Sequence, residues 1–345
     1  MKYDEIVLNL LNGNTSNQST NTFLNENYEI INKDIISQSD FIPICKRTVT
    51  YIVQTVLIND NRQVCLIQEA KLSCKGKSYL PAGRMEPNET LTDAVKRECQ
   101  EEAGLLAEPL ALCCVEINSK HLWFRFTFLA KCSGKLKTIE QADDESLMAE
   151  WIDLDQLDKP SFQNRIRASD FIDIVKLADS YYTHFSINSI NASINQLKYL
   201  KLPFLNEYKH IIFSYLIVNN DLTKFILLNE HSLPSIIFKP DLYLSMTNDF
   251  VKYSLSSIIL PRLFKHSNII KISNKQILDI DHNGKSNNDG IKFLFLISIK
   301  AFPDSNSNKD LYETYDICTW HSMTSNQEII KRFENELNFM KLIIY

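Results

Sequence analysis

The residues best suited to chemistry lie between Gly83 and Leu105, in the segment GRMEPNETLTDAVKRECQEEAGL. Within it, Glu98, Glu101 and Glu102 stand at i, i+3 and i+4, so an α-helix would project all three carboxylates from one face. Like charges at these spacings repel one another and weaken an isolated helix, and a bound cation would offset that cost. Oxygen-only ligands beside a glycine-containing loop indicate Mg²⁺ or Mn²⁺, and such hard cations typically accompany phosphates.

Local signals predict the elements that would position these carboxylates. Pro81 and Gly83 interrupt a preceding strand, and Thr90 or Thr92 can cap the helix that follows. Gly104 stands where a helix commonly ends with a left-handed residue. The segment therefore predicts a loop, a helix and a stop, with the acids on one side of the helix.

The charged and glycine positions of this segment match the Nudix box. Gly83, Glu89 and the run from Arg97 to Leu105 (RECQEEAGL) fall in its register. Cys99 departs mildly from the larger aliphatic residue that the family prefers, but a buried cysteine behaves as a small hydrophobe and should not disturb the site. The alternative is a solvated acidic helix face, which is the usual default for an isolated Glu-Glu pair. Because so many positions match in register, the segment is identified as a member of the Nudix family.

This resemblance implies metal-dependent hydrolysis of a nucleoside diphosphate linked to another group. It implies that Glu98, Glu101 and Glu102 share Mg²⁺ (or Mn²⁺), and that Glu98 or Glu102 also accepts the proton of the attacking water. The carbonyl of Ala82 matches a main-chain metal ligand, and Glu145 is expected to supply a further carboxylate from a later loop. The alternative for Glu145 is an exposed loop acid. Structural support of the box is expected from Gly83, Glu89, Arg97 and Gly104, with Glu89 and Arg97 forming a salt bridge.

The chain as a whole has the composition of a globular protein. Its 345 residues suggest two domains, with 44% hydrophobic and 23% charged residues. The net charge of −5 gives no support for nucleic-acid binding, and no apolar run reaches the length of a membrane span. The N-terminal residues lack the apolar core of a signal peptide, and the eight cysteines have no zinc-site spacing. We therefore expect a soluble cytoplasmic protein that binds a small-molecule nucleotide, with no nucleic-acid or membrane partner; protein partners cannot be identified.

Periodicity predicts an α/β protein. We expect a partly flexible segment at 1–45, a Nudix hydrolase domain at 46–182, a linker at 183–202 and a further domain at 203–345. The Nudix domain is predicted to be an α/β/α sandwich on a mixed sheet, with strands at 51–58, 64–67, 110–117, 121–132 and 149–154 and a helix at 169–182.

The further domain parallels the first along its length. Residues 57–60, 64–69, 94–96 and 124–130 align with 217–220, 225–230, 250–252 and 291–297, and Trp151 aligns with Trp320. In this register Glu98, Glu101 and Glu102 become Ser254, Ser257 and Ile258. The alignment predicts a second, degenerate Nudix-like α/β domain without the catalytic box. The alternative is an unrelated α/β domain whose strands align by chance.

The sequence around the box resembles the animal members of the family that degrade 8-oxo-dGDP. The resemblance covers residues 48–180 and includes LIQEAKLSCKGKSYLPAGRMEPNETL and DDESLMAEW. It implies hydrolysis of 8-oxo-dGDP and 8-oxo-GDP to the monophosphate and phosphate, which removes damaged guanine from nucleotide pools. Two alternatives stay open: a Nudix hydrolase of another nucleoside diphosphate derivative such as ADP-ribose, and a regulatory binding protein with vestigial hydrolysis. The strand at 121–132 is interpreted as a packed aromatic face, and substrate contacts are not identified.

Overall fold

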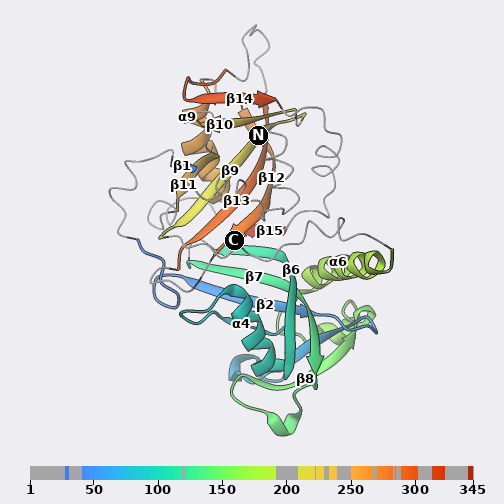
Figure 1. The fold of residues 1–345 in the computed structure, drawn as a ribbon. Coiled ribbons are helices and arrows are strands. Elements are labelled where there is room, and N and C mark those ends of the chain that lie inside the picture. Colours follow the sequence, from blue (N-terminus) through green and yellow to red (C-terminus); the bar gives the residue numbers. More distant parts are fainter. Residues whose placement is uncertain are drawn as a thin grey trace. The chain divides into compact units, whose positions relative to one another are not determined.

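The computed structural model of the protein divides into two compact units (Figure 1). We call Cys45–Ile117 with Trp123–Pro203 the box unit, and Met1–Ile44, Asn118–Leu122 and Phe204–Tyr345 the C-terminal unit. The structure describes residues 28–30, 41–118, 121–191, 209–221, 223–228, 233–238, 250–265, 267, 270–282, 284, 289–301, 313–322 and 341–344. Most of the segment 1–45 that we predict to be flexible lies outside the described residues, as does 192–202 of the predicted linker.

The box unit contains a mixed sheet and a small antiparallel sheet. In the mixed sheet the order is β6-β7-β2-β5, with β2 parallel to β7 and antiparallel to β5. The small sheet has the order β4-β3-β8, and both of its pairings are antiparallel. The strands are β2 (Thr50–Leu57), β3 (Gln63–Glu69), β4 (Ser78–Tyr79), β5 (Ala82–Arg84), β6 (Leu105–Asn118), β7 (Trp123–Gly134) and β8 (Ser146–Asp153).

Helices flank the mixed sheet. Helix α4 (Leu91–Glu98) packs on β2 and β5, and α6 (Ile172–Asn191) packs against β7. The remaining short helical segments are η1 (Leu72–Cys74), η2 (Cys99–Ala103), η3 (Ile139–Gln141), η4 (Leu154–Gln156) and α5 (Pro160–Gln163). The predicted mixed sheet with flanking helices is therefore confirmed for this unit.

The last helix is longer than the sequence pattern predicts. Helix α6 continues to Asn191, through much of the segment at 183–202 that we predict to be a linker. Residues 183–191 of the predicted linker are therefore helical. The segment is rich in Asn and Ser, but it contains no Gly or Pro, the residues that most strongly end a helix.

Aromatic residues on one face of the mixed sheet form the core beneath α4. Tyr51 packs edge-to-face on Phe124 and Phe126, with ring centroids 5.7 and 6.1 Å apart, and all three are buried. The helix turns its buried Leu91, Ala94, Val95 and Cys99 inward. This packing holds α4 beside β5, so the end of the helix lies close to Gly83 of that strand.

The C-terminal unit is built on one sheet with both parallel and antiparallel pairings. Strand β9 is parallel to β13 and antiparallel to β10 and β11, while β13 pairs antiparallel with β12, β10 with β14, and β1 runs parallel to β11. The elements are β1 (Tyr28–Ile30), β9 (Ile211–Asn219), β10 (Lys224–Leu228), β11 (Leu233–Ile237), α8 (Phe250–Tyr253), η6 (Ser254–Ile259), α9 (Leu260–Leu263), β12 (Ile270–Asp281), β13 (Ile291–Ala301), β14 (Cys318–Ser322) and β15 (Lys341–Ile344).

Candidate active site

The box folds as a capped helix that ends in a wider turn. The Thr90 hydroxyl accepts a hydrogen bond from the Asp93 N–H at 3.1 Å, and the Asp93 carboxylate accepts one from the Thr90 N–H at 3.2 Å. Thr90 is thus the cap that the helix uses. Helix α4 passes directly into the π-helical turn η2, and Gly104 closes it at a φ of 73° while donating its N–H to the Cys99 carbonyl.

The π-helical turn changes which carboxylates share a face. Glu98 and Glu102 are buried, at 6% and 5% exposure, and line one cavity, whereas the Glu101 side chain is 42% exposed. A π-helical turn closes on the fifth residue instead of the fourth, which brings Glu102 beside Glu98 and carries Glu101 outward. The face of three carboxylates that the spacing predicts therefore contains two in this structure.

Arg97 ties the loop of the box to its helix. Its Nε and Nη2 donate to the two Glu89 oxygens at 2.6 and 3.0 Å, and Nη2 also donates to the Arg84 carbonyl at 3.0 Å. Its Nη1 donates to Glu98 at 2.7 Å and to Glu101 at 2.9 Å. Burial opposes ionisation of Glu89, but the hydrogen bonds from Arg97 outweigh it and lower the pKa of Glu89.

A cavity of about 440 Å³ opens where β5, the helix end and several loops meet. Four of the five predicted metal ligands line it: Ala82, Glu98, Glu102 and Glu145. Four basic side chains line the same cavity: Lys46, Lys71, Arg84 and Arg97. The cavity lining thus combines acidic groups that suit a cation with basic residues of the kind that bind phosphate oxygens.

The two buried carboxylates are held in unfavourable surroundings for their charge. Burial raises the pKa of Glu102 to about 8, although the Ala82 N–H donates a hydrogen bond to it at 2.8 Å. Burial also raises the pKa of Glu98, and the negative charges of Glu101 and Glu145 act in the same direction against the pull of Arg97. A divalent cation would compensate such groups, so this oxygen donor set fits Mg²⁺ or Mn²⁺.

Gly83 leaves the space that the Glu98 side chain fills. A Cβ at Gly83 would lie 2.1 Å from Cδ and Oε1 of Glu98 and 2.2 Å from its Oε2. The Glu98 carboxylate therefore lies where a side chain at position 83 would begin.

Within the described ranges, no three His, Cys, Asp or Glu side chains are close enough together to enclose an ion.

A second polar network lies on the opposite face of the mixed sheet. The Arg125 guanidinium donates to Glu116 at 2.6 Å, to the Tyr79 hydroxyl at 2.8 Å and to Asp170 at 2.8 Å. Glu116 is fully buried, and burial raises the pKa of Tyr79 to about 12. The interpretation of this strand as a packed aromatic face does not predict the network, because it rests on the phenylalanines alone. Arg125 and Thr127 alternate with those phenylalanines, and this alternation is the signal of a polar face.

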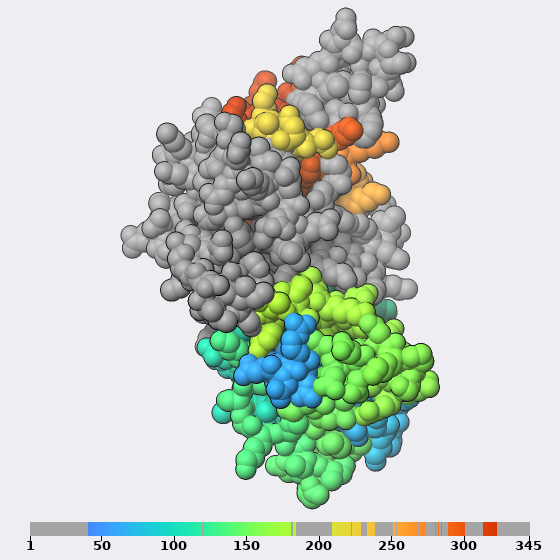
Figure 2. All heavy atoms as spheres, turned by 90° about the vertical axis from the view of Figure 1, so that its right-hand side faces the viewer, coloured from blue at the N-terminus to red at the C-terminus, as the bar shows by residue number. Residues whose placement is uncertain are grey.

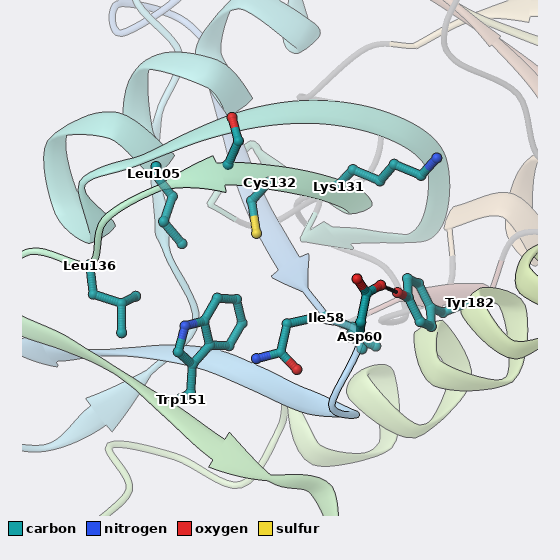
Figure 3. A pocket seen from close by; sticks show the side chains of 11 residues that line it. Ile58, Asp60, Leu105, Lys131, Cys132, Leu136, Trp151 and Tyr182 are labelled. Atoms are coloured by element: carbon teal, nitrogen blue, oxygen red, sulfur yellow. Dashed lines mark hydrogen bonds between the residues drawn. The ribbon is translucent and has the colours of Figure 1, made fainter.

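A separate cavity of about 340 Å³ lies away from the box carboxylates, none of which line it. In Figure 2 the blue turn between β2 and β3 reaches the surface beside the yellow-green atoms of α6, and the Tyr182 hydroxyl of α6 donates to Asp60 of that turn at 3.0 Å. Figure 3 shows this pair at one side of the cavity, while the Cys132 thiol points toward the Trp151 ring. None of the residues predicted for the site lies here.

Comparisons with known proteins identify the family. The family model of the NUDIX domain matches residues 50–172. The chain is also 30% identical over 121 residues to an ADP-ribose pyrophosphatase of Methanocaldococcus jannaschii. The aligned region covers 34% of this chain and 69% of that protein. The chain therefore belongs to the Nudix hydrolase family.

Within this family the chain is similar to proteins named 8-oxo-dGDP phosphatase NUDT18. Identity is 45% to the protein of Mus musculus and 46% to that of Homo sapiens, each over 137 residues. These matches cover 39% of this chain and 41% of each relative, so the chain spans about two fifths of their length. A NUDIX hydrolase structure from Nitrosomonas europaea aligns with a TM-score of 0.34 and 26% identity, covering 41% of this chain and 76% of that one. No helix of the described ranges is long and apolar enough to cross a membrane.

Proposed function

We propose that the protein hydrolyses oxidised purine nucleoside diphosphates, chiefly 8-oxo-dGDP and 8-oxo-GDP, to the monophosphate and inorganic phosphate with the help of Mg²⁺ or Mn²⁺. The observation that carries the proposal is the cavity in which Glu98, Glu102 and Glu145 face a set of basic side chains. The reaction needs both, because a phosphoanhydride repels anionic attack until its oxygens are neutralised.

The residues of the cavity would have two roles, metal binding and proton acceptance. Glu98, Glu102 and the Ala82 carbonyl would hold the metal, with Glu145 as a further ligand, and the metal would neutralise phosphate oxygens and lower the pKa of water. Glu98 or Glu102 would accept the proton of the attacking water, and the raised pKa of Glu102, about 8, suits a base that works near neutral pH. Glu101 does not line the cavity, so its side chain would have to turn inward to join the ligands.

One observation supports an oxidised purine as the substrate, and a second supports a guanine base. The NUDT18 relatives carry the name 8-oxo-dGDP phosphatase, whereas the relative named ADP-ribose pyrophosphatase is less similar. Asp170 is partly exposed, and Tyr79 and Arg125 fix its carboxylate by hydrogen bonds at 3.0 and 2.8 Å. A fixed carboxylate is a suitable acceptor for the N–H groups of a guanine base.

A panel of nucleotides assayed with Mg²⁺ tests the proposal. We expect the highest turnover with 8-oxo-dGDP and 8-oxo-GDP, low turnover with unmodified dGDP, and loss of hydrolysis in Glu101→Gln and Glu102→Gln variants. Strong ADP-ribose turnover without 8-oxo-dGDP turnover would replace the substrate. Hydrolysis that is unchanged in both variants would show that the box is not the active site, as in a regulatory binding protein.

We further propose that residues 203–345 form a degenerate Nudix-like domain and that residues 46–182 form the catalytic domain. The register of the parallel strands supports this. The sequence comparison aligns Leu57 with Ile217 and, separately, Ala130 with Ile297. Leu57 pairs with Ala130 between β2 and β7, and Ile217 pairs with Ile297 between β9 and β13.

The antiparallel strands give a second, independent agreement. The same comparison aligns Cys65 with Ile226 and Trp151 with Trp320. Cys65 pairs with Trp151 between β3 and β8, and Ile226 pairs with Trp320 between β10 and β14. Strands of an unrelated fold would match both registers only by coincidence, since a shift of one residue breaks the agreement.

The positions that correspond to the box lack its chemistry. In this register Ile236 takes the place of Gly83, and Ser254 takes the place of Glu98. The Ser254 hydroxyl forms a buried hydrogen bond with the Tyr215 hydroxyl at 2.7 Å instead of facing a cavity as an acid. One metal-dependent centre per chain is expected, and titration of the full chain with Mn²⁺ would reveal any comparable site that persists after Glu98→Gln and Glu102→Gln.

A further inference from the structure

We propose that Lys137 is a positioning residue of the active site: its buried ammonium fastens the loop that carries Glu145 to the end of the box helix. This inference rests on the proposed function, because Glu145 acts there as a metal ligand. Lys137 itself does not line the cavity, so its influence on the site would pass through the loop.

The contacts of Lys137 explain why its charge is buried. The side chain is 5% exposed, and its Nζ donates to the Glu101 carbonyl at 2.9 Å and to the Asp143 carboxylate at 2.6 Å. A buried ammonium is costly unless charged and polar acceptors surround it. Lys137 therefore joins two segments that lie far apart in the sequence, the helix end and the loop.

Asp143 links Lys137 to the backbone of Glu145 through hydrogen bonds. Its Oδ2 accepts from Lys137, and its Oδ1 accepts from the N–H groups of Glu145 and Ser146, each at 3.0 Å. The Ser146 hydroxyl in turn donates to the Glu102 carbonyl at 2.7 Å. The backbone of Glu145 is thus held at a fixed place relative to the helix that carries the other carboxylates.

The last carbonyls of the box helix accept hydrogen bonds from this loop and from Lys137. The carbonyls of its last residues lack partners within the helix, and Lys137 and Ser146 supply hydrogen bonds to those of Glu101, Glu102 and Ala103. A positive charge is favourable at a helix C-terminus. Gly104 permits the close approach of the two backbones, because a Cβ at Gly104 would lie 2.9 Å from the backbone nitrogen of Lys137.

Direct titration of the full chain with Mn²⁺ tests the role of Lys137. We expect Lys137→Met to weaken Mn²⁺ binding by roughly 10-fold or more, as removal of groups that orient metal ligands typically does. Lys135→Met is the matched control, because Lys135 is an exposed lysine of the same segment. It should bind Mn²⁺ as the wild type does. Asp143→Asn keeps the acceptor for the loop N–H groups but loses the charge, and it should weaken binding in the same direction with less effect on folding.

A double-mutant cycle separates positioning from general damage. In a Glu145→Gln background, Lys137→Met should cause little further loss of Mn²⁺ affinity, since its effect passes through Glu145. An undiminished loss in that background, or unchanged affinity in both Lys137→Met and Asp143→Asn, would overturn the positioning role alone. Absence of Mn²⁺ binding in the wild type would instead refute the proposed function, and this role with it.

Discussion

The substitution Gly83→Ala separates the geometry of the site from the stability of the fold. It adds one methyl group at the point where the backbone of β5 approaches the Glu98 carboxylate. Gly83 is not among the residues with a positive φ, so alanine fits the backbone there. The three atoms nearest to the added Cβ all belong to the Glu98 side chain, so we expect that side chain to move.

The size of the effect follows from the distances. The added Cβ would lie 2.1 Å from the Glu98 carboxylate, and ordinary contact begins at 3.4 Å, so the carboxylate must move by at least 3.4 − 2.1 = 1.3 Å. A misplacement of about 1 Å among reacting groups costs about 10²-fold in rate. We expect kcat/KM to fall about 100-fold, which corresponds to about 2.7 kcal/mol.

Gly76→Ala provides the control with the opposite outcome. Gly76 has a φ of 75° and no atom within 4 Å of an added Cβ. Alanine in the left-handed region costs about 1 kcal/mol, so this variant should lose stability and keep its activity. Gly83→Ala should change the free energy of unfolding by less than about 1 kcal/mol, because the substitution also restricts the unfolded chain.

These expectations are tested by measuring 8-oxo-dGDP hydrolysis and urea unfolding of both variants. Activity of Gly83→Ala within about threefold of the wild type would refute the reasoning, because the Glu98 position would then not matter. Equal losses of activity and stability in Gly83→Ala would show that the methyl group disturbs the fold as a whole.

Three further outcomes concern stability. Arg125→Met should destabilise the protein by about 3–5 kcal/mol in urea unfolding, because it removes the Arg125 charge that pairs with the fully buried Glu116, and adding Glu116→Gln should recover part of the loss. Thr90→Ala should cost about 1 kcal/mol in thermal unfolding through loss of the helix cap. The pKa of Glu102 is raised to about 8, so its protonated form favours folding, and this contribution is lost as pH rises from about 4.5 to about 8. In EDTA the wild type should therefore lose up to about 1.4 kcal/mol per pH unit more than Glu102→Gln in that window, and equal slopes would contradict the assignment.

The sequence predicts best those features that depend on neighbours along the chain. Thr90 caps α4 because Asp93 follows it at the required spacing, and Gly104 ends η2 because it adopts the left-handed conformation. The pairing of Glu89 with Arg97 also follows from the pattern of the box. The mixed sheet could be predicted because alternation of apolar residues is a local property of each strand.

Features that depend on distant partners could not be predicted in this way. The π-helical turn forms at a helix end whose carbonyls are taken up by Lys137 and Ser146, and neither residue belongs to the box. Nor does a sequence show that Arg125 meets Glu116 and Asp170, because these residues come together only when β6, β7 and the segment before α6 fold. Both features consist of polar contacts across the fold, which periodicity does not reveal.

The contact between Gly83 and Glu98 also explains how a Nudix-like fold could lose its chemistry in a consistent way. While the Glu98 carboxylate lies beside β5, any side chain larger than hydrogen at Gly83 displaces it. Once a shorter residue replaces the acid, as Ser254 does in the proposed register, that restriction ends and the space becomes a void. In the proposed register Ile236, which is 1% exposed, stands at the position of Gly83, and a buried apolar side chain there is compatible with the absence of the acid. If residues 203–345 form the proposed domain, we expect loss of the acid and loss of the glycine to be coupled, because a side chain at the glycine position would occupy the place of the carboxylate.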